Sequence, residues 1–216
     1  MQDNLYMKEI MEQYAQNKQD EWVLSETNNK QNGYFVDFGA CDGLIFSNTY
    51  LLEKEYNWNG ICCEPNKSYH KELVSNRPNS IIDFRCVYSE TGKVVNFFDV
   101  TDNPELSAME EYAFIQDEHY DKRQKNIPYE IKTVSLYDLL QQHNAPNKID
   151  FLSIDTEGSE YDILNNFDFN SYNIKTICVE HNWTHNRIKI FDLLLMNGYE
   201  RVFVEKSRWD DWYVKR

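Results

Sequence analysis

The residues with the clearest chemical potential are acids that end short apolar runs. Asp37 ends the first run, and a turn with two glycines follows it, Gly39-Ala40-Cys41-Asp42-Gly43. Glycine lets a chain turn sharply and pass close to a ligand. Glu64 ends the next apolar run, and an acid at the end of the strand after a glycine turn is placed to accept hydrogen bonds from ribose hydroxyls. This pattern indicates a nucleotide-type cofactor site.

A second acidic cluster follows the apolar run 149–154. It contains Asp155, Glu157 and Glu160, with Gly158 turning the chain between them. Carboxylates this close are costly unless they face water, a cation or hydrogen-bond donors. Glu157 and Glu160 could alternatively cap the following helix, where acids suit the positive end of the dipole. Asp155 is harder to explain in that way.

A third acid-tipped run ends in Glu180-His181. If the strands are parallel neighbours, Asp155, Glu157, Glu180 and His181 converge on one rim. His181 could act as a general base, since its unperturbed pKa lies near neutrality, or it could be structural. The same four residues could bind Mg²⁺ or Mn²⁺. We do not favour that variant and assign no metal ligand, because carboxylates around a sulfonium explain the same residues.

The elements that must position these residues alternate between strands and helices. Strands are predicted at 34–38, 60–64, 80–87, 94–100, 130–134, 149–154, 174–180, 199–204 and near 211–215. Helices are predicted at 47–56, with Ser47 as N-cap, and at 66–75, 135–143, 159–166 and 186–197. Alternating βα units predict an α/β fold with a mainly parallel sheet, helices on both faces and the ligand site at the carboxyl ends of the strands.

Two segments depart from this rhythm. Residues 1–32 are predicted to form a helical extension, because Met7, Ile10, Met11 and Tyr14 share one helical face. The domain itself is expected to span 33–216. Within it, the charged and aromatic stretch 101–128 reads as an insertion over the site, and we expect it to act as a substrate-facing lid.

Composition excludes several classes of partner. The 216 residues carry a formal net charge of −14 with a pI of about 4.7, so the summed field repels phosphate backbones and anionic membranes. We expect no nucleic-acid partner and no membrane partner. A basic cluster reads as a solvated loop face; it comprises His119, Lys122, Arg123 and Lys125.

The cysteines indicate a reducing compartment. They number five, sit mostly in or next to apolar runs, and have neither disulfide-framework nor zinc-site spacing. No apolar leader and no run of about 18 apolar residues occurs. We therefore expect a soluble, cytoplasmic protein.

Together, the acidic clusters resemble the FkbM family of S-adenosylmethionine-dependent methyltransferases. The resemblance is carried by residues 36–40 with Gly43, by Glu64-Pro65, and above all by residues 149–160 with their Asp-Thr-Glu-Gly-Ser-Glu run. It continues through Val179-Glu180-His181 and Gly198-Tyr199, and so spans roughly residues 33–204. The Asp-Thr-Glu-Gly-Ser-Glu run is its specific part.

The resemblance implies a class I methyltransferase fold, a Rossmann-like three-layer sandwich with a mostly parallel seven-stranded sheet whose last strand is antiparallel. It implies S-adenosylmethionine as cofactor and S-adenosylhomocysteine as product. The implied cofactor-binding residues are Asp37, Gly39, Ala40, Gly43, Glu64, Pro65, Val87, Asp155 and Glu157. Glu64 would hold the ribose, Val87 would lie near the adenine, and Asp155 and Glu157 would lie near the sulfonium. The sequence departs from many class I enzymes after Val87, where the acid that binds the adenine amine is missing and Asp83 lies too early to replace it.

The resemblance also implies an activity, O-methylation of a hydroxyl on a sugar, glycan or small metabolite. Methyl transfer needs alignment, and an alcohol is a poor nucleophile until its proton is accepted. We expect Asp155 or His181 to accept that proton, with Glu180 in support. The acceptor and the oligomeric state are not specified by the sequence.

Two other functions remain open at this point. A nucleotide-cofactor oxidoreductase also uses a glycine turn and a ribose acid, although its Gly-x-Gly-x-x-Gly fingerprint is absent here. A methyltransferase-like domain that has lost catalysis would instead be a binding module. The acids are present at all the expected strand ends, which argues against a loss of catalysis.

Overall fold

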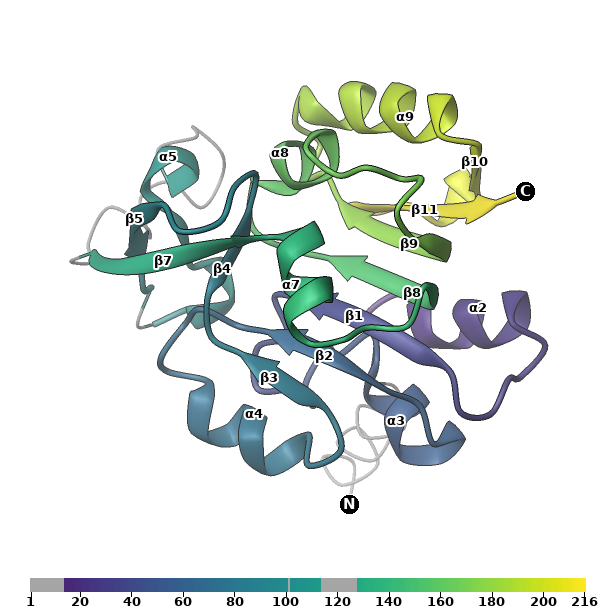
Figure 1. The fold of residues 1–216 in the computed structure, drawn as a ribbon, viewed down its shortest axis with the longest axis horizontal. Helices are drawn as coiled ribbons and strands as arrows, with labels where there is room; N and C mark the ends of the chain where they lie inside the picture. The colour runs from purple at the N-terminus through teal and green to yellow at the C-terminus, as the bar shows by residue number, and fades with distance from the viewer. Residues whose placement is uncertain (1–13, 101, 114–127) are drawn as a thin grey trace, which may run out of the picture.

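The computed structural model describes residues 14–100, 102–113 and 128–216. Its centre is a seven-stranded sheet in the order β10-β11-β9-β8-β1-β2-β3 (Figure 1). Neighbouring strands are parallel except β11, which is antiparallel to both β9 and β10. The strands are β1 (Tyr34–Phe38), β2 (Asn59–Cys63), β3 (Ile81–Asp83), β8 (Lys148–Ile154), β9 (Asn173–Glu180), β10 (Tyr199–Val202) and β11 (Asp210–Lys215). The expected α/β fold is confirmed, including the antiparallel last strand.

Helices cover both faces of this sheet. One face packs against α2 (Gln19–Glu26), α3 (Tyr50–Tyr56) and α4 (His70–Asn76). The other packs against α7 (Leu136–Gln142), α8 (Glu160–Asn165) and α9 (Asn186–Met196). Figure 1 shows α8 and α9 over the β9–β11 side and α3 and α4 near β1–β3. The result is the expected three-layer arrangement.

Alternation along the strands divides the core between the two faces. In β1, Phe35 packs into the cluster with Trp22 and Trp58, whereas Val36 and Phe38 pack into the cluster on the other face. Successive strand residues point to opposite faces, and a sheet covered on both sides needs apolar residues on both. This explains why the strands read as nearly continuous apolar runs.

The segment 80–88 differs from the sequence prediction of one strand at 80–87. β3 ends at Asp83, and β4 (Cys86–Tyr88) begins a second sheet, in the order β4-β7-β5-β6. The other strands of this sheet are β5 (Val94–Phe98), β6 (Ala108–Met109) and β7 (Tyr129–Ser135). The Asp83 carboxylate accepts hydrogen bonds from the backbone amide and the guanidinium of Arg85, and this local turn separates the two strands.

The segment before β1 contributes α2 to the domain. Trp22 stacks on Trp212 with ring centroids 5.0 Å apart and meets Phe151 edge-on at 6.2 Å. The helical face expected from Met7 to Tyr14 lies almost entirely outside the described residues, which begin at Tyr14.

The expected insertion is described only in part. Residues 102–113 form η1 (Pro104–Leu106), β6 and α5 (Glu110–Ala113). Residue 101, residues 114–127 and the basic cluster at 119–125 lie outside the described residues. A short 3-10 helix, η2 (Val204–Lys206), precedes β11. The prediction of Ser47 as the N-cap was wrong, because α3 begins at Tyr50 with Thr49 as its N-cap; Ser47 Oγ instead accepts the amides of Thr49 and Tyr50 from the turn before the helix. None of the described helices combines the length and apolar character needed to cross a membrane.

Candidate cofactor and catalytic site

A cavity of about 320 Å³ lies at the carboxyl ends of β1, β2, β8 and β9. Its size falls within the range of small-molecule sites, about 300–1,000 Å³. The sequence-predicted residues that line it are Asp37, Gly39, Ala40, Glu64, Pro65, Val87, Asp155, Glu157 and Glu180. Gly43 and His181 are not among the lining residues. The structure thus gathers the acids of four separate strand ends around one cavity.

The turn after β1 forms one wall of the cavity. The amides of Gly39 and Ala40 donate to the carbonyl of Cys63 at 3.0 and 3.2 Å, which fixes the turn against the end of β2. Gly39 has a φ of +75°, a left-handed conformation that favours glycine. Asp37 is buried and accepts a hydrogen bond of 2.6 Å from Thr49 Oγ1, and burial raises the pKa of its carboxyl. Asp37 therefore joins the end of β1 to the start of α3.

Gly43 has a packing role behind this wall. A Cβ there would lie 2.6 Å from the Arg77 side chain and 2.7 Å from that of Leu73. Arg77 is itself buried, forms a 2.7 Å ion pair with Glu53, and donates to Ser47 Oγ at 3.3 Å. The sequence reasoning missed this buried pair, because nothing in its spacing distinguishes it from surface charges.

Glu64 projects from the end of β2 into the cavity wall. One of its oxygens accepts the amide of Cys41 at 2.8 Å, and the other accepts the amide of Asn66 at 2.7 Å. Each carboxylate oxygen keeps a further acceptor position. Burial, partly offset by these two amide hydrogen bonds, raises the pKa of Glu64 to about 7. The side chain is thus locked in place with acceptor capacity left for a ligand.

Asp155, Glu157 and Glu180 form an acidic cluster in the opposite wall. One carboxylate oxygen from each lies within 4.8 Å of the others. Asp155 opens into the cavity, yet the surrounding protein removes enough bulk water to raise its pKa to about 7, and the charge of Glu160 adds to the effect. Burial, and then the charge of Asp155, raises the pKa of Glu180 well above its usual range. Burial and mutual repulsion thus make the charged forms of both Asp155 and Glu180 costly.

Glu160 supports this cluster from behind. Its Oε1 accepts the amides of Thr156 and Gly158 at 2.9 and 3.0 Å and the Thr156 hydroxyl at 2.9 Å. Glu160 is buried, and it does not line the cavity. Its contacts order the loop at the start of α8, in keeping with the capping interpretation of this residue.

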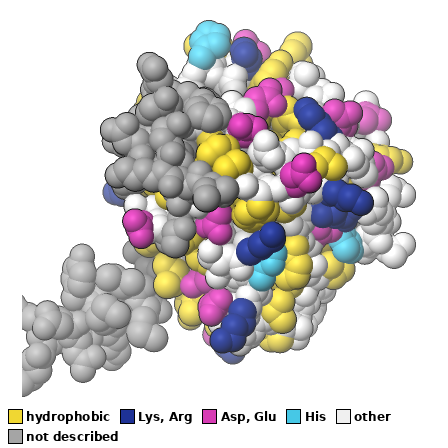
Figure 2. All heavy atoms as spheres, turned by 90° about the vertical axis from the view of Figure 1, so that its left-hand side faces the viewer, with side chains coloured by type: hydrophobic (Ala, Val, Ile, Leu, Met, Phe, Trp, Pro, Cys, Tyr) yellow, Lys and Arg dark blue, Asp and Glu magenta, His cyan; other side chains and the backbone are white. Residues whose placement is uncertain are grey.

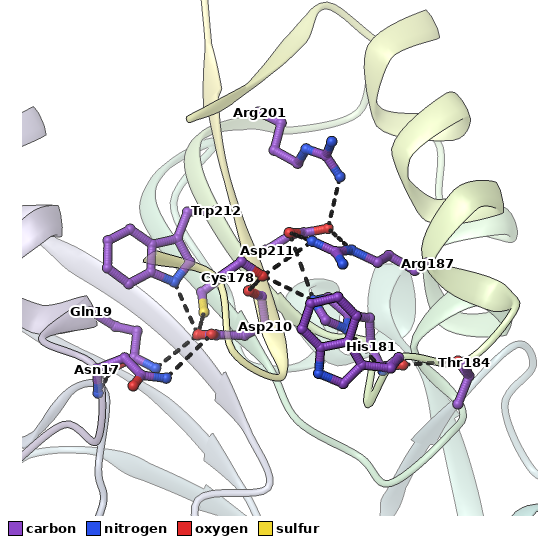
Figure 3. Close-up of polar contacts among 12 residues, drawn as sticks. Asn17, Gln19, Cys178, His181, Thr184, Arg187, Arg201, Asp210, Asp211 and Trp212 are labelled. Carbon is purple, nitrogen blue, oxygen red and sulfur yellow. Dashed lines mark hydrogen bonds and ion pairs between the residues drawn. The ribbon is translucent and has the colours of Figure 1, made fainter. Parts of the chain in front are cut away.

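His181 does not line the cavity and lies in the polar network around Asp211, which Figure 3 shows in close-up. The amide of Trp183 donates to its Nδ1 at 3.0 Å, so the neutral ring carries its proton on Nε2. Nε2 lies 3.1 Å from Ser207 Oγ and 3.7 Å from a carboxylate oxygen of Asp211. Burial lowers the pKa of His181 to about 4, against the opposing charge of Asp211. The ring is a neutral structural group, so of the two candidate bases only Asp155 faces the cavity.

Asp210 is a cavity residue that the sequence reasoning missed. It accepts hydrogen bonds from Gln19 Nε2 at 2.7 Å and Trp212 Nε1 at 3.0 Å, with Cys178 Sγ at 2.9 Å (Figure 3). Gln19 and Asp210 both line the cavity. The segment before β1 and the last strand thus meet at the site. No motif in the sequence signals this meeting.

Apolar side chains line part of the cavity next to Val87. This part is completed by Phe97, Leu106 and Met109, which come from the second sheet and from η1. Asp83, by contrast, pairs with Arg85 and His143 and does not line the cavity. An apolar slot beside Glu64 suits a flat base next to a ribose. The three residues that complete it were not singled out in the sequence, because Phe97 lies in a predicted strand without a motif and Leu106 and Met109 lie in the segment interpreted only as an insertion.

Figure 2 views the protein from the side to which the ends of β1, β2 and β8 point. On the part of this face made by described residues, Lys and Arg side chains are interspersed with Asp and Glu, and hydrophobic atoms lie between them. Within that part, Figure 2 shows no extended basic patch.

Comparison with known proteins gives one match to a family. The model of the methyltransferase FkbM domain matches residues 37–211. No curated protein sequence matches at a significant level. Among solved structures, the chain is similar to precorrin-6y C5,15-methyltransferase from Geobacter metallireducens GS-15, with 11% identity, a TM-score of 0.46 and coverage of 90% of this chain and 85% of that one. It is also similar to a TehB-like SAM-dependent methyltransferase from Corynebacterium glutamicum, with 8% identity, a TM-score of 0.46 and coverage of 92% and 88%.

Proposed function

This chain belongs to the methyltransferase FkbM domain family, and from that membership we propose that it methylates a hydroxyl oxygen of a sugar, a glycan or a small metabolite. As a member of the family it is an S-adenosylmethionine-dependent methyltransferase. The observation that carries the proposal is the cavity that Glu64 and Asp155 both line, at the ends of the two parallel strands that flank β1. The oxidoreductase alternative is set aside, because the family match covers the whole stretch from Asp37 to Asp211.

The residues present fit the cofactor. Glu64 is held by two amides and keeps acceptor capacity for ribose hydroxyls. The slot formed by Val87, Phe97, Leu106 and Met109 suits an apolar base. The acidic cluster suits a cation, because carboxylates favour positive charge nearby. When bound, S-adenosylmethionine supplies a methyl group activated by its cationic sulfonium.

The chain's own contribution is to align the acceptor and to take its proton. Asp155 faces the cavity and has a pKa of about 7, close to the pH at which a general base works best. Burial, and then the charge of Asp155, raises the pKa of Glu180 well above its usual range, which disfavours a second negative charge beside Asp155. Asp155 is therefore the group we assign to accept the hydroxyl proton, with Glu180 in support.

The test compares hydroxylated acceptors with their deoxy analogues. Purified protein is incubated with a donor labelled in its methyl group and with pools of sugars and small hydroxylated metabolites, and labelled products are located by mass spectrometry. We expect the label on an oxygen and no product from the matching deoxy compound. Label on nitrogen, or equal labelling of the deoxy analogue, would contradict O-methylation. Cofactor binding without transfer of the methyl group to any acceptor would favour the alternative that the domain is a binding module without catalysis.

A further inference from the structure

The acidic cluster brings three carboxylates together at one point of the cavity. Asp155 and Glu157 follow β8, and Glu180 ends β9, whose parallel pairing sets Ile154 beside Val179. The two strand ends therefore deliver three carboxylates to one point, with an oxygen of each within 4.8 Å of the others. Like charges at this spacing repel strongly unless protons or cations neutralise them.

Glu180 supplies an independent observation. Its side chain is buried, with the residue only 6% exposed, and it lines the cavity. Its Oε2 has no hydrogen-bond partner among the residues that the structure describes. A buried acceptor without a partner costs free energy. Asp155 is its interacting neighbour and is also an acceptor when ionised, so a cation or a proton between the two carboxyl groups has to satisfy this oxygen.

We propose that Asp155, Glu157 and Glu180 hold one divalent cation of the oxygen-preferring class, Mg²⁺ or Mn²⁺. Mg²⁺ binds oxygens at about 2.0–2.1 Å, so two oxygens on opposite sides of the ion lie about 4 Å apart. The three carboxylate oxygens lie within 4.8 Å of one another, so side-chain shifts of less than about 1 Å bring them to this distance. His181 takes no part, because its two ring nitrogens already contact the Trp183 amide and Ser207.

The cation would act on the acceptor. Three protein oxygens leave up to three positions of an octahedral ion open, and an acceptor hydroxyl in one of them would be oriented and made more acidic. Its proton would pass to the oxygen of Asp155 that does not face the ion. This inference rests on the proposed function, since it assigns the cation a place in the transfer to a hydroxyl.

The experiment measures cation binding without any methyl donor. Full-length protein is treated with a chelator, desalted and titrated with Mn²⁺, and free Mn²⁺ is followed by electron paramagnetic resonance. We expect one Mn²⁺ per chain, and we expect Glu180→Gln and Glu157→Gln each to weaken binding about tenfold or more. Glu105→Gln is the matched control, because it removes a carboxylate from the same cavity but outside the cluster. Its affinity should stay within about twofold of the wild type.

Circular dichroism shows whether each variant has kept the secondary structure of the wild type. Glu157 is only half-buried, so Glu157→Gln is expected to fold even if the buried Glu180→Gln does not. Absence of saturable Mn²⁺ binding in the wild type, or unchanged affinity in folded Glu157→Gln, would overturn the proposal.

Calorimetry with S-adenosylhomocysteine in a chelator separates this proposal from the proposed function. Binding of the nucleoside without Mn²⁺ binding would overturn the cation site and leave the methyltransferase function standing. Mn²⁺ binding that depends on Glu157, without binding of the nucleoside, would support the site and contradict the function.

Discussion

The backbone carbonyl oxygen of Asp155 lies 1.8 Å from the position that a Cβ on Gly39 would occupy. The ends of β1 and β8 therefore touch directly beneath the cavity, through backbone atoms alone. Asp155 also donates its amide to the carbonyl of Phe38 at 3.1 Å. The glycine is thus required where the turn that lines the site meets the strand that delivers the base.

Gly39→Ala should lower the free energy of unfolding by at least about 3 kcal/mol, since it adds a clash with backbone to a left-handed conformation. Chemical denaturation at neutral pH measures the loss. Gly92→Ala is the control, because Gly92 has a φ of +87° but nothing within 4 Å of its Cβ position. The control isolates the conformational cost, about 1 kcal/mol. Equal losses in the two variants would show that the contact with Asp155 does not matter.

Glu64 should make the unliganded protein less stable as pH rises. Its pKa is raised from 4.5 to about 7, so between these values the folded protein keeps a proton that the unfolded chain has lost. Linkage then makes the free energy of unfolding fall as pH rises across this window. Urea midpoints at pH 5 and pH 7.5 should show a smaller fall for Glu64→Gln than for the wild type. An identical fall would mean that Glu64 is not the group responsible.

Asp155→Asn should remove the proposed base with little change in the shape of the cavity. We expect turnover to fall about 10²- to 10⁴-fold, with S-adenosylhomocysteine affinity changed far less. Wild-type turnover should rise with pH around 7, because the charged form of Asp155 is the one that accepts the proton. Steady-state rates and calorimetry provide the two readouts. Unchanged turnover would remove Asp155 from the mechanism.

His181→Asn should affect stability and leave the cofactor site intact. The ring is buried against Asp211 and Ser207, outside the residues that line the cavity. Thermal melting should show a lower Tm, while S-adenosylhomocysteine affinity stays within about twofold of the wild type. If the variant instead kept the stability of the wild type and lost the pH dependence of turnover, His181 would be the base that accepts the proton.

Much of this site follows from rules that act within single strands. Apolar runs that end in acids predict strands that deliver those acids to one edge of a parallel sheet. Glu64, Asp155 and Glu180 accordingly line one cavity. The seven strands of the main sheet and the antiparallel β11 agree with what the family resemblance implied.

The remaining features depend on side-chain direction and on strand register. Glu180 faces the cavity, and the next residue in an extended chain points to the other side, so His181 turns away. Asp210 reaches the site because it pairs with Glu180 in the antiparallel register of β11 and β9. That register is a tertiary property without a sequence motif. The turn at Asp83 and Arg85 likewise divides an apolar run that local propensity reads as one strand.

The most direct test of the account is calorimetric titration of the folded protein, free of co-purified ligand, with S-adenosylmethionine and S-adenosylhomocysteine. NAD serves as the control ligand. Glu72→Ala serves as the matched control for Glu64→Ala, because Glu72 is exposed on α4 and does not line the cavity. The account predicts binding of both sulfur nucleosides, no binding of NAD, and a loss of about ten- to hundredfold in Glu64→Ala alone. Failure of the wild type to bind either sulfur nucleoside, or binding of NAD in their place, would contradict it.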